Sequence, residues 1–507
     1  MNGAVGAQPG AGRGAGPEVE RGAGAGTDVD TDTGTAAAAD IDTDVVIVGA
    51  RCAGSALGAL LAEQGVRVTV LERSPAIGYT LSSNILQADS LAFLDRLGLT
   101  GRLREAGAVP LTHIDMRLGD TSFTARLPQR PGDEGGAACI RRQVLDPLLA
   151  EAAERAGVDL RLGTRVTGLL PEGGRVAGVR AVKGGTEYTV RAHLVVGADG
   201  RDSTVARLCG SRQYHVIPGE RSYYWTYFEG ADPGPHPTFV FHRWEDRHML
   251  GGPADSGLYI VGVSPRRHEA DAFRRDLEGS VLAHAAQCAP IERALRGARR
   301  ASRIYGIRRF AGYFREAAGP GWVLLGDSGH FKDPAGGRGI GDAFDQAQKL
   351  ADAVADALRG PAPAAALDRV GERFGRWRDR TYAEYHGLAA DLGVAGPIAS
   401  VVPQVVGRMH AKGAVDPVLH LLAHRASVTQ VLTPGRVLGA TGRMLLRGSA
   451  PGRRAVLGEL GGLAATEVRR RRAMRHPVYE RAAAVEPTGG DSGGAVAAPD
   501  TTVEVRP

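Results

Sequence analysis

A glycine-rich turn near residue 50 combines residue types that can bind the phosphates of a dinucleotide. The segment Asp44-Val-Val-Ile-Val-Gly49 is apolar and β-branched, so it predicts a buried strand that ends in a tight turn. Gly49 permits the turn, and Gly54 lets the following helix pack close to the strand. The N-terminus of that helix then presents free N–H groups and the positive end of its dipole to a pyrophosphate.

An acidic residue follows at the spacing that such a site requires. The chain continues through a helix to a second apolar strand that ends at Glu72, 23 residues after Gly49, with Arg73 next to it. The Glu72 carboxylate is placed to accept hydrogen bonds from the adenosine ribose hydroxyls. Arg51 replaces the second glycine of the usual pattern, so its side chain either turns outward or grips the phosphate. A strand–helix–strand unit that binds no nucleotide is the plain alternative.

Two more apolar strands each run into a turn made of Gly and Asp. The first ends in Asp199-Gly200, and the second ends in Gly326-Asp327. Taken singly, Asp199 is explained by a surface turn and Asp327 by a helix cap. Together with the Gly49 unit, the two turns favour a shared ligand site over those explanations.

In these three motifs the chain resembles the single-component FAD-dependent aromatic hydroxylases, the p-hydroxybenzoate hydroxylase-like flavoprotein monooxygenases. The resemblance covers about residues 42–385, with the motifs in the family's order. It implies an α/β fold with a Rossmann-like FAD-binding domain of the glutathione reductase type. An antiparallel β-sheet substrate domain would be inserted into that domain, and a helical C-terminal region would follow it. The resemblance also implies that FAD is the cofactor and that NAD(P)H and O₂ are consumed.

The resemblance assigns roles to several residues of this sequence. Asp199 and Gly200 would serve both flavin and nicotinamide binding, and Asp327 would hold a ribityl hydroxyl of FAD. Arg142, in the segment Arg142-Gln-Val-Leu-Asp146, would contact FAD. No basic residue lies between Arg73 and Arg96, where many relatives keep an arginine, so the docking of the nicotinamide cofactor is left open.

The segment after Asp327 would form the flavin loop. Pro334 and Gly337-Arg338-Gly339 would lie along the isoalloxazine, ahead of a helix whose N-terminus can stabilise negative charge on the reduced ring. Arg338 and Gly341 stand where the family usually has Gln and Asn. The expected cofactor-binding residues are therefore Gly49, Arg51, Gly54, Glu72, Arg73, Arg142, Asp199, Gly200, Gly326, Asp327, Pro334, Gly337 and Gly339.

Aromatic residues gather between Ser222 and Trp244, where eight of the chain's 27 are found. Together with the run Leu258–Val263, they predict an antiparallel sheet. Successive side chains of a strand point to opposite faces. About half of the strand aromatics should therefore line a substrate site, and plain sheet packing is the alternative for each. The candidates are Tyr224, Trp225, Tyr227, Phe239 and Phe241.

The resemblance implies that the flavin carries the chemistry. NAD(P)H reduces FAD, O₂ adds to give a flavin C(4a)-hydroperoxide, and an electron-rich substrate takes up the terminal oxygen while the protein excludes water. The implied substrate is an aromatic or polyketide-like small molecule of secondary metabolism, such as antibiotic biosynthesis. His330, Tyr224 and Tyr227 are the expected catalytic residues, and a structural histidine after a turn is the alternative for His330.

Composition changes along the chain suggest domain boundaries. The Gly/Ala-rich and Asp/Thr-rich start and the polar end have too little to bury, so both are expected to be disordered. The expected regions are a tail at 1–41, an FAD-binding domain at 42–212 and 305–385, a substrate domain at 213–304, a helical region at 386–481 and a tail at 482–507.

Charge and composition exclude several classes of protein. The 507 residues, 43% hydrophobic and 23% charged, describe a soluble globular protein. The formal charge of +6 combines −6 over residues 1–44 with +12 over residues 45–507. That excess suits anionic ligands such as dinucleotides, and no motif for nucleic acid accompanies it. The four scattered cysteines have no zinc-ligand spacing, so neither a metal nor a disulfide is expected. We expect a cytoplasmic protein with no membrane span, and a homodimer is left open.

Two other functions stay open beside the monooxygenase. The first is an FAD-dependent reductase or dehydrogenase of the geranylgeranyl reductase-like group, which shares this flavin domain with the halogenases. The Trp-x-Trp-x-Ile-Pro signature of the halogenases is absent from the sequence. The second is a non-catalytic flavin-binding protein.

Overall fold

The computed structural model describes residues 40–78, 80, 84–447 and 449–479. The predicted disordered tails lie outside these ranges apart from residues 40 and 41. Ile41 already belongs to the first strand, β1 (Ile41–Asp42). Contacts place the described residues in one unit. The predicted boundaries between the flavin domain, the substrate domain and the helical region therefore stay predictions.

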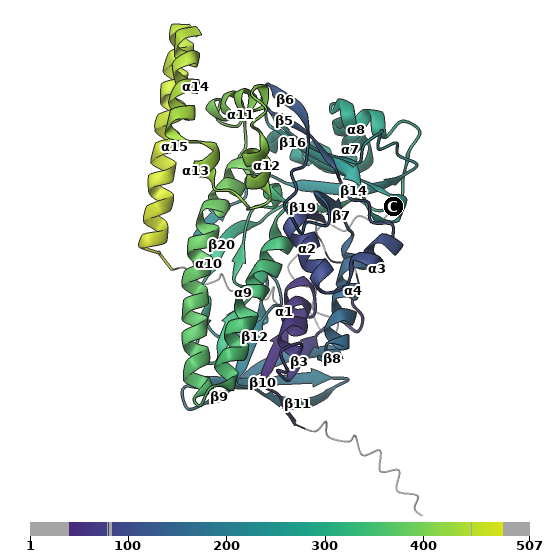
Figure 1. Ribbon diagram of the computed structural model, residues 1–507, viewed down its shortest axis with the longest axis vertical. Coiled ribbons are helices and arrows are strands. Elements are labelled where there is room, and N and C mark those ends of the chain that lie inside the picture. The colour runs from purple at the N-terminus through teal and green to yellow at the C-terminus, as the bar shows by residue number, and fades with distance from the viewer. Residues whose placement is uncertain (1–39, 79, 81–83, 448, 480–507) are drawn as a thin grey trace, which may run out of the picture. The chain divides into compact units, whose positions relative to one another are not determined.

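A mostly parallel sheet of six strands is the central sheet of the fold (Figure 1). Its order is β21-β22-β12-β2-β3-β8, and β21 alone runs antiparallel to its neighbour. Each of the three predicted strand–turn motifs contributes a strand, so the predicted α/β core is confirmed. The strands are β2 (Val45–Val48), β3 (Val68–Glu72), β8 (Asp159–Leu162), β12 (Leu194–Gly197), β21 (Ala318–Gly319) and β22 (Trp322–Leu324).

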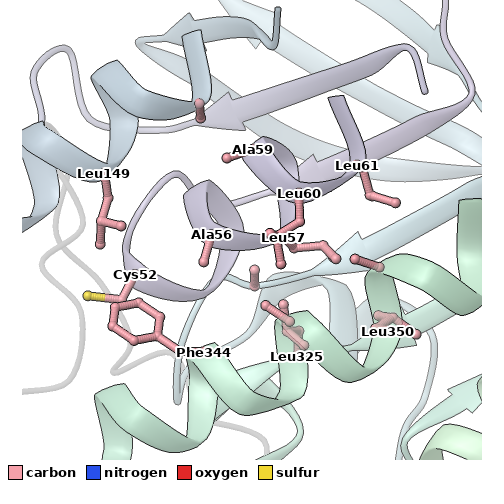
Figure 2. Packing of buried hydrophobic residues seen from close by; sticks show 14 of the residues in the cluster. Cys52, Ala56, Leu57, Ala59, Leu60, Leu61, Leu149, Leu325, Phe344 and Leu350 are labelled. Carbon is pink, nitrogen blue, oxygen red and sulfur yellow. The ribbon is translucent and has the colours of Figure 1, made fainter. Parts of the chain in front are cut away.

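Helices cover one face of this sheet. α1 (Cys52–Ala62) packs against both α4 (Arg142–Arg155) and α9 (Gly339–Arg359). Figure 2 shows Leu57 and Leu60 of α1 among Leu149, Phe344 and Leu350 of the two neighbouring helices, and all five are buried. Because α1 is packed on several sides, nine of its eleven residues are buried.

A smaller sheet covers the other face. Its order is β1-β11-β10-β9, and its Val166, Val179 and Val190 pack against alternate residues of the central sheet, such as Val46 and Val195. The fold here is therefore three layers of helices, parallel sheet and small sheet. The remaining strands of the small sheet are β9 (Thr164–Glu172), β10 (Arg175–Lys183) and β11 (Thr186–Arg191).

The predicted aromatic sheet is present, and it extends beyond the predicted insert. The order β18-β14-β17-β16-β15-β5-β6 includes two strands from residues 113–126, and the β15–β5 pair is parallel. The other pairs are antiparallel. The strands are β5 (His113–Leu118), β6 (Thr121–Arg126), β14 (Tyr223–Glu229), β15 (Thr238–Trp244), β16 (Arg247–Pro253), β17 (Tyr259–Ser264), β18 (Arg299–Arg300) and β19 (Tyr305–Ile307), which pairs with β14.

Alternation divides the aromatic side chains of this sheet between two cores. Trp225, Tyr227 and Phe241 lie in one core, which also contains residues of the C-terminal helices. Tyr224 and Phe228 lie in the other core. The second core is covered by α6 (Ala270–Arg275), α7 (Leu277–Ala285) and α8 (Ala289–Ala294).

Short elements connect these layers. One small sheet consists of β13 (Gln213–Pro218), β20 (Ala311–Arg315) and β23 (His330–Phe331). Another consists of β4 (Ile85–Gln87) and β7 (Ala137–Cys139). The short helices are α2 (Ala88–Arg96), α3 (Thr100–Glu105) and α5 (Thr204–Leu208). The 3-10 turns are η1 (Asp255–Gly257), η2 (Arg267–Glu269), η3 (Gly326–Ser328) and η4 (Pro334–Gly336).

The described C-terminal part of the chain is helical, as the sequence predicts. No helix among the described residues is long and apolar enough to cross a membrane. The helices are α10 (Pro363–Gly393), α11 (Val401–Ala411), α12 (Asp416–Leu422), α13 (Val428–Val431), α14 (Pro434–Arg447) and α15 (Ala450–Arg475).

Gly54 is required where α1 crosses the end of β2. A Cβ atom at Gly54 would lie 1.8 Å from the carbonyl oxygen of Gly49, which is backbone and cannot move aside. We predict that Gly54→Ala lowers the free energy of unfolding by at least about 1–3 kcal/mol, since overpacking forces the backbone apart. Chemical denaturation of the full chain measures this.

Gly101 is the matched control. It also lies in a helix, α3, but a Cβ there meets nothing within 4 Å. Gly101→Ala should leave stability unchanged or raise it by up to about 1 kcal/mol. Equal stability of the two variants would contradict the proposed close packing.

Candidate active site

A cavity of about 460 Å³ follows the carboxyl ends of the parallel strands. It reaches from the ends of β2, β3, β12 and β22 to the aromatic sheet, where Tyr223, His248 and Gly262 line it. Ligands of open α/β sheets bind at this edge. The cavity therefore joins the predicted cofactor region to the predicted substrate region.

The structure brings the predicted cofactor residues together around this cavity. Gly54 is the exception, since it lies beneath the cavity in the contact between α1 and β2. The lining residues are Gly49, Arg51, Glu72, Arg73, Arg142, Asp199, Gly200, Gly326, Asp327, Pro334, Gly337 and Gly339.

The turn after β2 is closely fitted to its neighbours. Gly49 has a φ of +102°, which is strained for residues with a side chain, and a Cβ there would lie 2.5 Å from the Ala198 carbonyl oxygen. Glu72 is held at the end of β3, because its carboxylate accepts hydrogen bonds from the N–H groups of Ala50 at 3.1 Å and Ser74 at 3.0 Å. A backbone edge free of side chains and a fixed carboxylate are what an adenine dinucleotide needs here.

Arg51 turns toward α4. Its Nη1 donates to the Gly78 carbonyl oxygen at 3.3 Å and lies 3.5 Å from Asp146. Asp146 also binds Arg142 through two hydrogen bonds of 2.7 and 2.8 Å. The two guanidinium groups and the N-terminus of α1 therefore meet at one end of the cavity, where an anion would be stabilised.

Asp199 and Asp327 differ in how their carboxylates are used. Asp199 accepts hydrogen bonds from Ser203 Oγ at 2.5 Å and from the Thr204 N–H at 2.7 Å, so it holds the start of α5. No hydrogen bond to the Asp327 carboxylate is found among the described residues, and burial raises its pKa. An unpartnered carboxylate at the cavity wall fits a ligand hydroxyl such as that of a ribityl chain.

The flavin loop carries a buried ionic cluster that the sequence reasoning missed. Lys332 pairs with Asp342 near the start of α9, and Nδ1 of His424 lies 3.0 Å from the same carboxylate. Arg338 binds Asp89 of α2 through two hydrogen bonds of 2.7 Å. His424 follows α12, so the C-terminal helical region reaches the cavity through this cluster. Lys332 is one of only four lysines in the chain, which was the one signal for it.

Asp342 is the carboxylate at the centre of this cluster, within 4 Å of Lys332, Arg338 and His424. Burial alone would raise the pKa of the carboxyl, but Lys332 and His424 outweigh it and hold that pKa well below its usual range. Burial lowers the pKa of His424 to about 3, so the ring is neutral. One anion thus anchors the flavin loop to two other segments.

The three predicted catalytic residues occupy different environments. His330 lines the cavity, but its ring stacks on Phe314 at 4.3 Å, and burial lowers its pKa well below the usual value. Tyr224 also contributes to the lining, while its ring stacks on Phe273 in the core on the far face of the sheet. Tyr227 is not a lining residue, and its hydroxyl is bonded to Asn84, which is one. These positions give no direct support to a catalytic role.

A different pair of polar residues lines the cavity: Tyr223 from the aromatic sheet and Asp333 from the flavin loop. The Tyr223 hydroxyl donates to Asp333 Oδ1 at 3.0 Å, and the same oxygen accepts the Ala335 N–H at 2.9 Å. Burial raises the pKa of Asp333 to about 6. The ring of His248, whose pKa burial lowers to about 3, packs edge-on against Tyr223. Sequence reasoning missed the pair because its members are 110 residues apart.

Comparison with known proteins identifies the cofactor region. A family model described as FAD binding domain matches residues 42–375. The 6-methylpretetramide 4-monooxygenase of Streptomyces rimosus is 29% identical over 331 residues, which cover 62% of this chain and 76% of that protein. The digeranylgeranylglycerophospholipid reductase of Methanocella arvoryzae is 26% identical over 370 residues, which cover 67% of this chain and 85% of that protein.

A solved structure shares the fold. The flavin-dependent brominase Bmp2 matches with a TM-score of 0.63 at 19% sequence identity, over 79% of this chain and 98% of the brominase chain. At this identity the likeness concerns the fold alone. It extends the similarity beyond residue 375, into the region of the C-terminal helices.

The buried ion pair gives a stability prediction. Asp342→Asn leaves Lys332 buried without a counter-charge, so we expect the free energy of unfolding at pH 7 to fall by about 3–5 kcal/mol. Because its pKa is lowered in the folded state, Asp342 stabilises the protein above about pH 4, and this stabilisation is lost as the pH falls further. Urea denaturation at several pH values measures both effects.

Asp356 provides the control for this substitution. It pairs with Arg359 on the exposed side of α9, and both side chains are more than half exposed. Asp356→Asn should change stability by no more than about 0.5 kcal/mol. If the two substitutions lower the free energy of unfolding by the same amount, the ionic cluster does not anchor the flavin loop.

Proposed function

We propose that this chain, which belongs to the FAD binding domain family and is an FAD-dependent oxidoreductase, is a monooxygenase that hydroxylates an aromatic or polyketide-like small molecule with NAD(P)H and O₂. The observation that carries the proposal is the cavity itself. It runs without interruption from Glu72 and Asp327 to Tyr223 and Trp225. A flavin held at one end would therefore face an aromatic-lined space at the other.

The cofactor is held by residues from four segments. Glu72 would accept hydrogen bonds from the ribose hydroxyls, the N-terminus of α1 and Arg51 would bind the pyrophosphate, and Asp327 would accept a hydrogen bond from a ribityl hydroxyl. Gly337 and Gly339, where α9 begins, would lie along the ring. The lining of the cavity by these residues supports the assignment.

Reduced by NAD(P)H, FAD supplies the electrons that activate O₂ for insertion into the substrate. The chain's own task is to exclude water from that reaction. Trp225 is buried in the wall of the cavity, and Leu250 and Ile307 add apolar surface beside it. A dry, aromatic wall of this kind favours a flat, weakly polar substrate.

The Tyr223–Asp333 pair handles the substrate proton. A phenolic hydroxyl in the cavity gives its proton to the Tyr223 oxygen while Tyr223 passes its own proton to Asp333 Oδ1. The electron pair stays on the substrate oxygen and makes the ring more reactive toward oxygen insertion. Arg221 lies close enough to Asp333 to lower its pKa, so it also favours negative charge at this end of the cavity.

The known relatives support the substrate class and one alternative. The Streptomyces relative is a monooxygenase of 6-methylpretetramide, which favours a polyketide-like substrate. The digeranylgeranylglycerophospholipid reductase relative favours the second candidate, an FAD-dependent reductase or dehydrogenase of the geranylgeranyl reductase-like group. Both functions need the same flavin site, and they differ in whether oxygen enters the product.

Isotope labelling distinguishes the two functions. The purified holoprotein is mixed with NADPH or NADH and a panel of phenols and aromatic polyketides under ¹⁸O₂. We expect at least one compound to accelerate NAD(P)H oxidation and to gain one ¹⁸O atom, as measured by mass spectrometry. Anaerobic NAD(P)H consumption with a reduced, unlabelled product would establish the reductase instead.

The proton acceptor predicts a pH dependence. Because the Asp333 carboxylate must be ionised to accept a proton, kcat/KM should fall as the pH drops below about 6. Asp333→Asn keeps an acceptor for Tyr223 and Ala335 but cannot take the proton. It should lower the hydroxylation rate by about 10²–10⁴-fold at pH 7 and remove the acid limb of the pH profile.

Tyr259→Phe is the control for this experiment. Tyr259 is buried in the same sheet, in the core on the far face, so its variant should keep the wild-type profile. An Asp333→Asn enzyme with the wild-type rate and acid limb would show that another group accepts the proton.

A further inference from the structure

Helices α14 and α15 pack against each other (Figure 1). Both helices expose large apolar side chains. On α14, Leu438 is 70% exposed and Leu446 is 84% exposed. On α15, Leu457 is 56% exposed and Val468 is 65% exposed. Spacings of eight and eleven residues place each pair on one side of its helix. Each helix therefore carries an outward apolar stripe.

The described side chains of α15 include no buried residue, although the helix has 26 residues. Most helices in proteins gain their stability from burying one face. α15 contacts the body through polar pairs, such as Glu459 with Ser400 at 2.8 Å and Arg470 with Asp391 at 2.7 Å, and through the half-buried Leu460 and Met474. Its outward stripe is therefore available to another surface.

The same two helices concentrate positive charge. Residues 434–475 contain ten arginines and two glutamates, a net charge of +8, which exceeds the +6 of the whole chain. Of the two glutamates, Glu459 binds Ser400 and Glu467 pairs with Arg471. On α15, Arg454 and Arg472 lie at helical spacing from Leu457 and Val468, so charge flanks the apolar stripe on its own face.

We propose that α14 and α15 form a docking surface for an anionic lipid bilayer. The exposed leucines would enter the boundary between headgroups and acyl chains, and the arginines would reach the lipid phosphates with their long side chains. Basic amphipathic helices bind anionic membranes through this combination of apolar burial and charge attraction. The helices would lie on the bilayer surface, and the cavity needs no rearrangement for this.

The positive charge of α14 and α15 distinguishes a bilayer from a second copy of this chain as the bound partner. A second copy of this chain would bring a second surface of +8 against the first, which opposes a dimer through these helices. An acidic protein would satisfy the arginines, and it is the alternative that the experiment must separate. Leu438 and Leu446 favour lipid, because a partner that satisfied only the arginines would leave this exposed apolar surface in water.

Vesicle flotation of the full-length holoprotein tests the proposal. We expect binding to vesicles of equal phosphatidylglycerol and phosphatidylcholine, and at least tenfold weaker binding to pure phosphatidylcholine. Arg454→Gln with Arg472→Gln should weaken binding about 30-fold, at about fivefold for each charge. Leu438→Ser with Leu446→Ser should weaken binding at least tenfold at unchanged charge.

Matched controls lie on the aromatic sheet and its helices. Leu282→Ser replaces a leucine that is 43% exposed on α7, and Arg296→Gln with Arg299→Gln removes two exposed charges. These variants should bind as the wild type does. Retained flavin absorbance and an unchanged circular dichroism spectrum show that each variant is folded.

Three outcomes would overturn the proposal. The first is that the protein does not bind the anionic vesicles. The second is that the control variants lose as much vesicle binding as the α14 and α15 variants do. The third is that binding survives the leucine substitutions while soluble polyglutamate competes for it. The last result would identify an acidic partner. A fourth result would also overturn it: a concentration-dependent dimer in lipid-free sedimentation that is lost in the leucine variants would identify a second copy of the chain as the occupant.

Discussion

The cavity depends on two close backbone contacts of the turn after β2, one with α1 and one with the residue that follows β12. Gly49 and Gly54 remove the side chains that would keep these backbones apart, since Cβ atoms there would lie 2.5 and 1.8 Å from carbonyl oxygens. These contacts place the N-terminus of α1, the Glu72 carboxylate and the turn at Asp327 along one edge of the sheet. Every other feature of the cofactor region is arranged around that edge.

A second constraint connects the distant parts of the chain to this edge. Asp342 holds Lys332 of the flavin loop and lies beside His424, which belongs to the C-terminal helical region. Replacing a buried ionic cluster requires several simultaneous changes, because each single loss leaves an unpaired charge in the interior. The C-terminal helices are thereby part of the cavity's support, a role that their sequence did not suggest.

Local sequence patterns predicted the elements, and long-range contacts decided the site. The run Val45–Val48 predicted a buried strand because it is apolar and β-branched, and the structure confirms it. Alternation predicted that only half of the strand aromatics face one side, and Tyr224 and Tyr227 do lie in different cores. Strand alternation does not say which face meets the cofactor edge. The Tyr223–Asp333 and Asp342–His424 contacts join segments that carry no sequence signal of each other.

We propose that the cavity edge formed by Gly49, Glu72 and Asp327 binds FAD. The visible spectrum of the purified chain, with the flavin released and quantified by chromatography, tests it most directly. We expect one FAD per chain, either as purified or after reconstitution, and little or none in Gly54→Val. A wild-type chain that is colourless and takes up no FAD, or a Gly54→Val chain that stays yellow, would contradict it.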